Sequence, residues 1–337
     1  MSVPFEIQDV DPELNAEVLT LFPKRKDGFV HAGSKKYLLY SKYRKEAVHY
    51  YNMELRPDDV WIISFPRSGS TWTQELVWLI NNDLDYETAL SKKLITRSPF
   101  LEYSFVLPDD FIAEMMEKHK NDPSKLDLLR ENFRPAYETL PKMKSPRHVK
   151  THFSLSLLPP KLLDTCKVIY VARNPKDVAV SYFHLHRLKG DIDMEADFPQ
   201  YWDIFQRDLL TWAPFWSHVE ESWRLKEHKN MLFLFYEDMK KDLPAAIRKT
   251  AAFLGKSYTD EQVIKLVDHL HIDNFRKQPA LQQLMNCVNG MKKNDAPGFY
   301  RKGESGAWRS MFPPELNAKA DEWIREHEKH TDLRFQF

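Results

Sequence analysis

The sequence predicts a single α/β domain with a mostly parallel central sheet that is flanked by helices. Apolar runs rich in β-branched and aromatic residues occur at 60–65, 167–172 and 231–235, which is typical of buried strands. Segments with helical spacing follow these runs, and this alternation indicates parallel strands covered on both faces. No repeat of fixed period, low-complexity segment or Gly/Ser linker divides residues 1–337, so we expect one domain.

The first of these runs leads into a strand–loop–helix unit. Gly69 is the only glycine between Gly33 and Gly190, and it lies where the backbone must curl tightly or approach a ligand. Apolar residues at helical spacing follow from Trp72 onward, so a helix begins directly after the loop.

The start of that helix is a candidate anion site. Its free N–H groups point toward the loop, which also carries the Arg67 guanidinium and the hydroxyls of Ser68, Ser70 and Thr71. An ordinary capped turn is the alternative interpretation. The pattern G-x-x-x-x-G-K-[ST] is absent, which argues against an ordinary P-loop NTPase.

Composition narrows the function classes. With 42% hydrophobic and 29% charged residues, the chain can bury a sizeable core, and its formal charge of +0 argues against a general nucleic-acid binder. Cys166 and Cys287 form neither a disulfide framework nor a zinc pattern. No apolar run approaches the length of a membrane span and residues 1–6 lack a signal-peptide pattern, so we expect a cytoplasmic protein.

Polar residues gather where predicted strands end. Arg67 and Ser68 follow the first strand, Lys150 and His152 end a short strand at 147–152, and Tyr236 follows the run at 231–235. The run at 167–172 is likewise followed by Arg173 and Ser181. Parallel strands bring these ends to one edge of the sheet, where the residues could converge on a phosphate or sulfate group.

Five segments, in the same order along the chain, resemble motifs of the cytosolic sulfotransferases. The chain is similar to that family in its phosphosulfate loop, catalytic-histidine strand, 3′-phosphate segment, following strand end and C-terminal phosphate-clamping loop. These segments are 64–72, 150–152, 171–182, 235–239, and 300–303 with Gly306 and Trp308. The match extends from about Asp59 to Trp308.

This resemblance implies a cosubstrate, 3′-phosphoadenosine 5′-phosphosulfate (PAPS), which leaves as the desulfated product PAP. It also implies a binding residue for each part of the nucleotide. The 5′-phosphosulfate would be held by Arg67, Ser68, Gly69, Ser70 and Thr71, the 3′-phosphate by Arg173, Ser181, Arg301, Lys302 and Gly303, and the adenine by Trp72, Tyr236 and Phe275.

The chemistry of sulfuryl transfer suits the residues at the strand ends. A neutral imidazole can take the proton of an acceptor hydroxyl, so His152 is the candidate general base. Lys150 and Arg67 are candidates for stabilising the sulfuryl oxygens and the leaving phosphate. The family most often has lysine where Arg67 stands, so we expect charge stabilisation rather than proton donation there. No carboxylate cluster has metal spacing, and no metal is expected.

Aromatic residues near the candidate base suggest a small lipophilic hydroxyl compound, a phenol or an alcohol, as the acceptor. By the resemblance, Phe100 and Tyr103 match acceptor-pocket positions, and Phe153 is a third candidate. The segment 104–145 is longer than usual for the family and is interpreted as a lid over this pocket, or as an exposed helical insertion.

Three other functions remain open at this stage. The same fold could give net dehydration of an allylic alcohol through a transient sulfate ester, or could bind PAPS or a lipophile without turnover. A nucleotide kinase is disfavoured because the P-loop lysine is missing.

Several segments lie outside these motifs. Residues 1–57 are expected to form an N-terminal arm on the core, or a solvated tail. The series Trp202, Trp212, Trp216 and Trp223 indicates helix packing. Pro313 and Pro314 replace a Thr-Val pair in the dimer signature common in the family, so a monomer and a homodimer are both possible.

Overall fold

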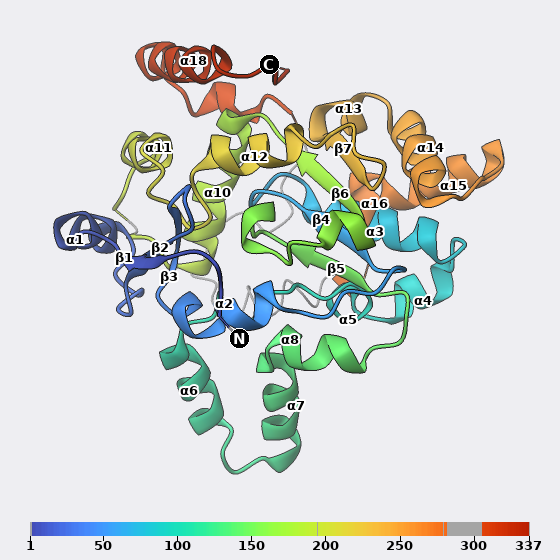
Figure 1. Cartoon of the computed structure of the whole chain (residues 1–337), viewed down its shortest axis with the longest axis horizontal. Helices are drawn as coiled ribbons and strands as arrows, with labels where there is room; N and C mark the ends of the chain where they lie inside the picture. The colour runs from blue at the N-terminus through green and yellow to red at the C-terminus, as the bar shows by residue number, and fades with distance from the viewer. Residues whose placement is uncertain (1, 194, 279, 282–304, 337) are drawn as a thin grey trace.

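The computed structural model describes residues 2–193, 195–278, 280–281 and 305–336. Within these ranges, the central sheet has four parallel strands in the order β5-β4-β6-β7. Their bounds are β4 Val60–Ile63, β5 His148–Thr151, β6 Lys167–Ala172 and β7 Met231–Phe235. The predicted α/β fold with a parallel central sheet is therefore confirmed (Figure 1).

The register of the sheet aligns the strand ends. Ile62 of β4 lies opposite Lys150 of β5 on one side and opposite Ile169 of β6 on the other. Because the strands are parallel, the segments that follow them all leave from one edge. The residues predicted to act together therefore start from neighbouring positions.

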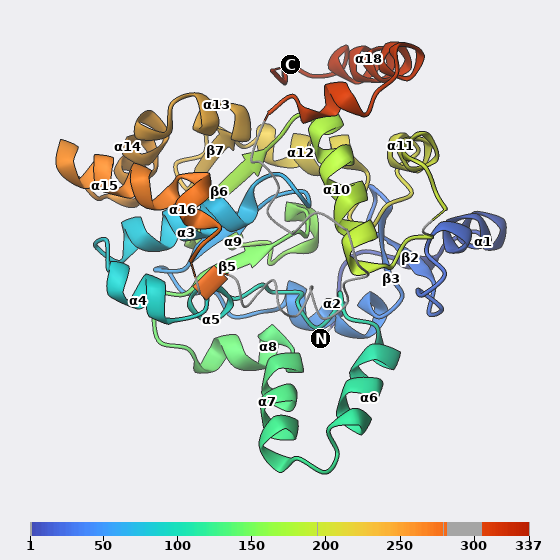
Figure 2. The same cartoon turned by 180° about the vertical axis from the view of Figure 1, so that it is seen from behind.

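Both faces of the sheet are buried, which explains why its strands read as continuous apolar runs. Trp61 and Ile63 pack into one core cluster, whereas Val60 and Ile62 pack into the other. Helices on the first face contribute Val178 and Val219 to the first cluster, and helices on the opposite face complete the second (Figures 1 and 2). The former are α10 Pro175–Lys189 and α12 Phe215–Trp223, and the latter α3 Ser70–Asn81, α14 Leu243–Leu254 and α15 Asp260–Leu270.

Residues 1–57 contain an antiparallel sheet that the sequence analysis did not predict. Its order is β1-β2-β3, with β1 Ile7–Asp9, β2 Phe29–Ala32 and β3 Tyr37–Tyr40, and it is accompanied by α1 Pro12–Leu21 and α2 Tyr43–Tyr51. Leu38 exchanges backbone hydrogen bonds with Trp212 and Ala213, each at 2.8 Å. This pairing joins the N-terminal segment to a loop that is distant in sequence.

Within the segment 104–145, two helices joined by a turn project from the body of the molecule, α6 Asp109–Lys118 and α7 Pro123–Phe133 (Figures 1 and 2). Neither helix contains a buried residue. Two basic residues of the N-terminal segment, Lys42 and Arg25, contact the chain where α6 begins. The Lys42 ammonium lies 2.9 Å from the Asp109 carboxylate, and the Arg25 guanidinium donates to the Val106 carbonyl at 3.0 Å.

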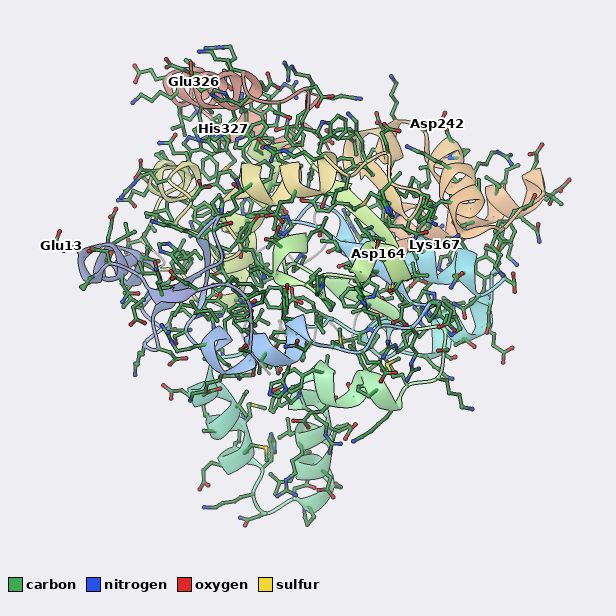
Figure 3. All side chains as sticks on the ribbon, in the orientation of Figure 1. Glu13, Asp164, Lys167, Asp242, Glu326 and His327 are labelled. Atoms are coloured by element: carbon green, nitrogen blue, oxygen red, sulfur yellow. The ribbon has the colours of Figure 1, made fainter. Side chains whose placement is uncertain are left out.

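Helix ends follow local capping rules. The Asp242 carboxylate, labelled in Figure 3, accepts the Ala245 N–H at 2.9 Å at the start of α14. Gly255 ends that helix at φ +75°, a conformation that glycine adopts readily. Pro314 is the first residue of α18, a position where proline fits a helix. The remaining elements are α4 Tyr86–Ser91, α5 Leu94–Arg97, α8 Ala136–Thr139, η1 Leu140–Lys142, η2 Leu155–Leu157, α9 Leu162–Thr165, α11 Phe198–Gln206, α13 Tyr236–Lys241, α16 Ile272–Phe275, η3 Ala307–Ser310 and α18 Pro314–Glu328.

Among the helices of the described residues, none is both long enough and apolar enough to cross a membrane.

Candidate active site

A cavity of about 950 Å³ lies at the carboxyl edge of the central sheet. Residues that follow each of the four strands line it, which brings together most of the predicted site. These are Arg67, Gly69, Ser70, Thr71, Trp72, Phe100, Tyr103, Lys150, His152, Arg173, Ser181, Tyr236 and Phe275. Arg301, Lys302 and Gly303 lie outside the described residues.

The loop between β4 and α3 has the features of an anion cradle. Gly69 has φ +104°, and a Cβ atom there would lie 2.7 Å from the Tyr236 ring, so the loop needs glycine for both backbone shape and space. Arg67 also has a positive φ, +68°, which is uncommon for a residue with a side chain. Ser68 Oγ is buried and accepts or donates no hydrogen bond within the described part of the chain. A buried hydroxyl without a protein partner, beside a helix start, fits a bound phosphosulfate.

Arg67 joins this loop to the segment after β6. Its Nε donates to the Ser181 hydroxyl at 3.0 Å, and Arg173 Nη1 donates to the Arg67 carbonyl at 3.2 Å. The Arg173 guanidinium also lies over the Tyr236 ring, 4.4 Å from its centroid. Two cations from different strand ends thus lie beside one loop, an arrangement suited to a ligand with several negative charges.

Helix α10 holds the chain that follows residue 304. The Asp177 carboxylate accepts the N–H groups of Gly306 at 2.7 Å and of Trp308 at 3.2 Å. Asn174 caps the same helix by accepting the Lys176 N–H at 2.9 Å. The C-terminal segment is therefore tied to the helix that carries Ser181.

Three aromatic residues line the part of the cavity predicted to surround adenine. The rings of Trp72 and Tyr236 are 5.7 Å apart at 64°, and the indole N–H of Trp72 donates to the Leu270 carbonyl at 3.0 Å. Phe275, at the end of α16, also lines the cavity. Rings held in this way offer a flat apolar base a fixed place to bind.

His152 is oriented by a hydrogen bond to the neighbouring strand. Its Nδ1 lies 2.7 Å from the Ser64 carbonyl oxygen. A carbonyl can only accept a hydrogen bond, so Nδ1 carries the proton and Nε2 keeps its lone pair. Burial and the Lys150 ammonium lower the pKa of His152 well below 6.5. The imidazole is therefore neutral near pH 7, the form in which it can accept a proton.

Lys150 shares this end of the cavity. Its ammonium lies over the Phe100 ring, 3.9 Å from the centroid, and the Phe100 ring is 5.2 Å from the imidazole of His152. Burial lowers the pKa of Lys150, while the nearby Glu102 carboxylate raises it. An imidazole and an ammonium group thus lie beside the same aromatic ring.

The part of the cavity predicted to hold the acceptor is lined mostly by apolar side chains. Phe100 and Tyr103, which were predicted to contact the acceptor, line this part of the cavity. Residues of the segment 104–145 line it as well. The residues contributed by that segment are Val106, Leu107, Phe111, Met115, Lys118 and Phe133.

Phe153 is not among the residues that line the cavity, in contrast to its predicted contact with the acceptor. Its side chain is fully buried against Tyr43 and Tyr50 of α2, with ring centroids 5.3 and 5.0 Å away. Successive side chains in an extended segment point to opposite sides, so a cavity-lining His152 directs Phe153 into the core.

Two residues near the imidazole escaped the sequence analysis. Trp212 was assigned to helix packing, but it lines the cavity and its ring is 5.5 Å from that of His152. Glu102 is fully buried and accepts hydrogen bonds from Thr151 Oγ1 at 2.8 Å and from the His152 N–H. Glu102 is a charged residue between two predicted pocket residues, Phe100 and Tyr103, and this position is the sequence feature that could have drawn attention to it.

Metal-ligating side chains do not gather in the described residues, where no group of three or more His, Cys, Asp or Glu could hold an ion. His186, one of the histidines on α10, instead bonds Asp191 at 2.8 Å.

Comparison with known proteins identifies the family. The family model "Sulfotransferase domain" matches residues 57–332. This chain belongs to the sulfotransferase family. It is 34% identical to luciferin sulfotransferase of Photinus pyralis over 281 residues, 81% of this chain and 72% of that protein. It is 30% identical to sulfotransferase 1C2 of Homo sapiens over 285 residues, 84% of this chain and 88% of the human one.

Among solved structures, retinol dehydratase in a complex with retinol and PAP matches with a TM-score of 0.90 and 38% identity, covering 100% of both chains. A second retinol dehydratase structure, with androsterone and the inactive cofactor PAP, has the same TM-score and identity and covers 99% of both chains. The protein is a PAPS-dependent sulfotransferase, with PAPS as cosubstrate and PAP as product. The buried Ser68 hydroxyl and the cradle at Gly69 fit this nucleotide.

We predict that the His152 imidazole stays neutral at pH 6.5 and takes up a proton only well below that value, because burial and Lys150 disfavour its charged form. NMR titration of the histidine ring protons measures this. The spectrum of His152→Gln identifies the signal, and a midpoint at or above 6.5 would contradict the prediction.

Proposed function

We propose that the protein transfers the sulfuryl group of PAPS to the hydroxyl of a small lipophilic alcohol or phenol, with His152 as the general base. The hydrogen bond between His152 Nδ1 and the Ser64 carbonyl, 2.7 Å long, carries the proposal because it leaves Nε2 as the basic nitrogen. That imidazole lines the same cavity as the loop of Arg67, Gly69 and Thr71.

Each residue then has a role in an in-line displacement. The acceptor oxygen forms a bond to sulfur as its proton passes to His152 Nε2, and the bond between sulfur and the bridging phosphate oxygen breaks. Lys150 and Arg67 stabilise the charge on the transferred group and the leaving phosphate. Ser68, Gly69, Ser70 and Thr71 hold the 5′-phosphosulfate.

The remaining nucleotide contacts come from the edge of the cavity. Arg173 and Ser181 hold the 3′-phosphate, together with Arg301, Lys302 and Gly303, while Trp72, Tyr236 and Phe275 surround the adenine. Support for this arrangement comes from the bonds that link Arg67 to both Ser181 and Arg173.

The apolar walls support a lipophilic acceptor. Phe100, Tyr103 and Trp212 lie near the imidazole, and Phe111 and Phe133 add aromatic surface from the projecting segment. The retinol dehydratase structures contain retinol and androsterone, both lipophilic alcohols. An alcohol of comparable size is the acceptor class that we favour.

Net dehydration of an allylic alcohol is a second candidate. The observation that favours it is the similarity to retinol dehydratase over the whole length of this chain. In that reaction the sulfate ester forms first; its C–O bond then breaks to release inorganic sulfate, and a proton leaves the allylic carbon chain to solvent to give the alkene. The two outcomes share the transfer step and differ in the fate of the ester.

The test is transfer of labelled sulfate from PAPS to a phenol, a saturated lipophilic alcohol and an allylic polyene alcohol. We expect labelled product with the wild type and a loss of about 10²-fold or more in kcat for His152→Ala, which lacks the base. PAP should still bind this variant, as measured by calorimetry. Recovery of an alkene with free labelled sulfate would favour dehydration.

Tight PAPS binding without turnover on any acceptor would favour a binding protein instead. Full activity of His152→Ala would remove His152 from the role of base.

For Arg67, we expect Arg67→Ala to lower kcat by roughly 10²-fold or more, because a cation at the developing charge is lost. Arg67→Lys should retain much of the rate but change kcat by more than about twofold, because lysine cannot reproduce the planar donor that contacts Ser181. Steady-state kinetics measure both variants. A smaller difference between wild type and Arg67→Lys would show that the identity of this cation is unimportant.

We also propose that α6 and α7 form a lid that selects the acceptor. Phe111→Ala and Phe133→Ala should each raise the KM for a bulky lipophilic alcohol by roughly tenfold, through loss of apolar contact, with little change in the KM for PAPS. Leu128→Ala is the matched control, because Leu128 lies on α7 and is 55% exposed. Unchanged acceptor preference in both phenylalanine variants would indicate an exposed insertion.

A further inference from the structure

Glu102 lies on a short segment that extends the central sheet beside β5. The Lys150 N–H donates to the Pro99 carbonyl and the Leu101 N–H donates to the Lys150 carbonyl, each at 2.8 Å. Phe100 and Lys150 form a parallel bridge at this point. The strand that carries Lys150 is therefore covered along its outer side, and the covering segment ends at Glu102.

The Glu102 carboxylate accepts hydrogen bonds from residues at the end of β5. One oxygen accepts the main-chain N–H of His152, and the other accepts the hydroxyl of Thr151 at 2.8 Å. The Thr151 oxygen in turn accepts the Phe153 N–H at 3.0 Å. One carboxylate thus fixes, directly or through a hydroxyl, three consecutive residues where the chain leaves the sheet.

The same carboxylate also attracts the Lys150 ammonium, although the two groups form no direct ion pair within the described residues. Burial raises the pKa of Glu102 to about 7, while the hydrogen bonds from the His152 N–H and the Thr151 hydroxyl and the charge of Lys150 hold it down. Burial lowers the pKa of Lys150 to about 8, and attraction to Glu102 raises it, whereas the Arg67 guanidinium lowers it. Loss of the carboxylate would remove the attraction that offsets the repulsion between Lys150 and Arg67.

The tyrosine and histidine side chains that lie near Glu102 and His152 carry no negative charge. Tyr43 and Tyr50 of α2 face Glu102, and burial raises the pKa of both phenols above 10, so they stay neutral. His218 of α12 lies 2.8 Å from the His152 carbonyl, and burial lowers its pKa to about 4. Among the described groups that act on the charge of Lys150, Glu102 is the acidic one.

We propose that Glu102 is a positioning residue for sulfuryl transfer, which holds the main chain of His152 in place and adds a negative charge at the end of the strand that carries Lys150. This inference rests on the roles proposed above for His152 and Lys150. Glu102 itself does not line the cavity, so it acts on the reaction through these two residues.

The test compares Glu102→Gln, which keeps the size of the side chain and removes its charge, with the wild type. We expect kcat at pH 7 to fall by about tenfold or more, because Lys150 loses its counter-charge. The alkaline limb of the kcat profile should move to lower pH by about one unit, since a cation without its anion loses its proton more readily. PAP affinity and thermal midpoint are measured on the same samples.

Glu102→Asp separates charge from geometry. It retains the negative charge but cannot reach both donors, so kcat should fall while the alkaline limb stays near its wild-type position. Glu46→Gln is the matched control, because Glu46 is a second buried glutamate whose carboxylate accepts a hydrogen bond from Tyr50 at 2.6 Å and, within the described residues, none from the end of β5. The pH profile of this control should match the wild type.

An NMR titration of the lysine side chains, assigned with Lys150→Arg, gives a readout that does not need turnover. The pKa of Lys150 should be lower in Glu102→Gln than in the wild type. An unchanged Lys150 titration and pH profile, with only a lower thermal midpoint, would reduce Glu102 to a structural residue and overturn the proposal. Absence of transfer by the wild type would count against the proposed function, while the lysine titration would still decide the role of Glu102.

Discussion

Hydrogen bonds that cross from one strand end to the next hold the carboxyl edge of the sheet together, and the cavity depends on them. His152 bonds the Ser64 carbonyl, Arg173 donates to the Arg67 carbonyl, and Arg67 donates to Ser181. Each bond satisfies a polar group that would be costly to leave unpaired inside the protein. The residues that follow the strands are thereby the same residues that present an imidazole and cations to the cavity.

Much of the fold could be predicted because burial on both faces leaves a strand apolar at every position. β4, β6 and β7 show this property, and their limits were close to those predicted. The N-terminal antiparallel sheet could not be predicted in the same way. Its strands have three or four residues, and Tyr37–Tyr40 is buried at all four positions, so no alternation of polar and apolar residues marks it.

The candidate site was predictable where it depends on strand ends and less so where it depends on distant packing. Residues that follow parallel strands meet at one edge of the sheet for any loop conformation. Arg67, His152 and Arg173 therefore line one cavity. Trp212 reaches the cavity through a loop that pairs with the unpredicted strand β3. Glu102 is a charged residue in a loop, and no local pattern shows that its carboxylate is buried.

The projecting helices have a consequence for the timing of the reaction cycle. α6 and α7 contain no fully buried residue, so a movement away from the body breaks no contact of a fully buried side chain on either helix, although it uncovers the cavity-lining side chains of Phe111, Met115 and Phe133. The sheet and its hydrogen-bonded edge need not loosen when they move. Under the proposed lid role, a ligand beneath these helices would leave by a motion confined to this segment, and its residence time would depend on the contacts that hold the two helices against the body rather than on the stability of the whole domain.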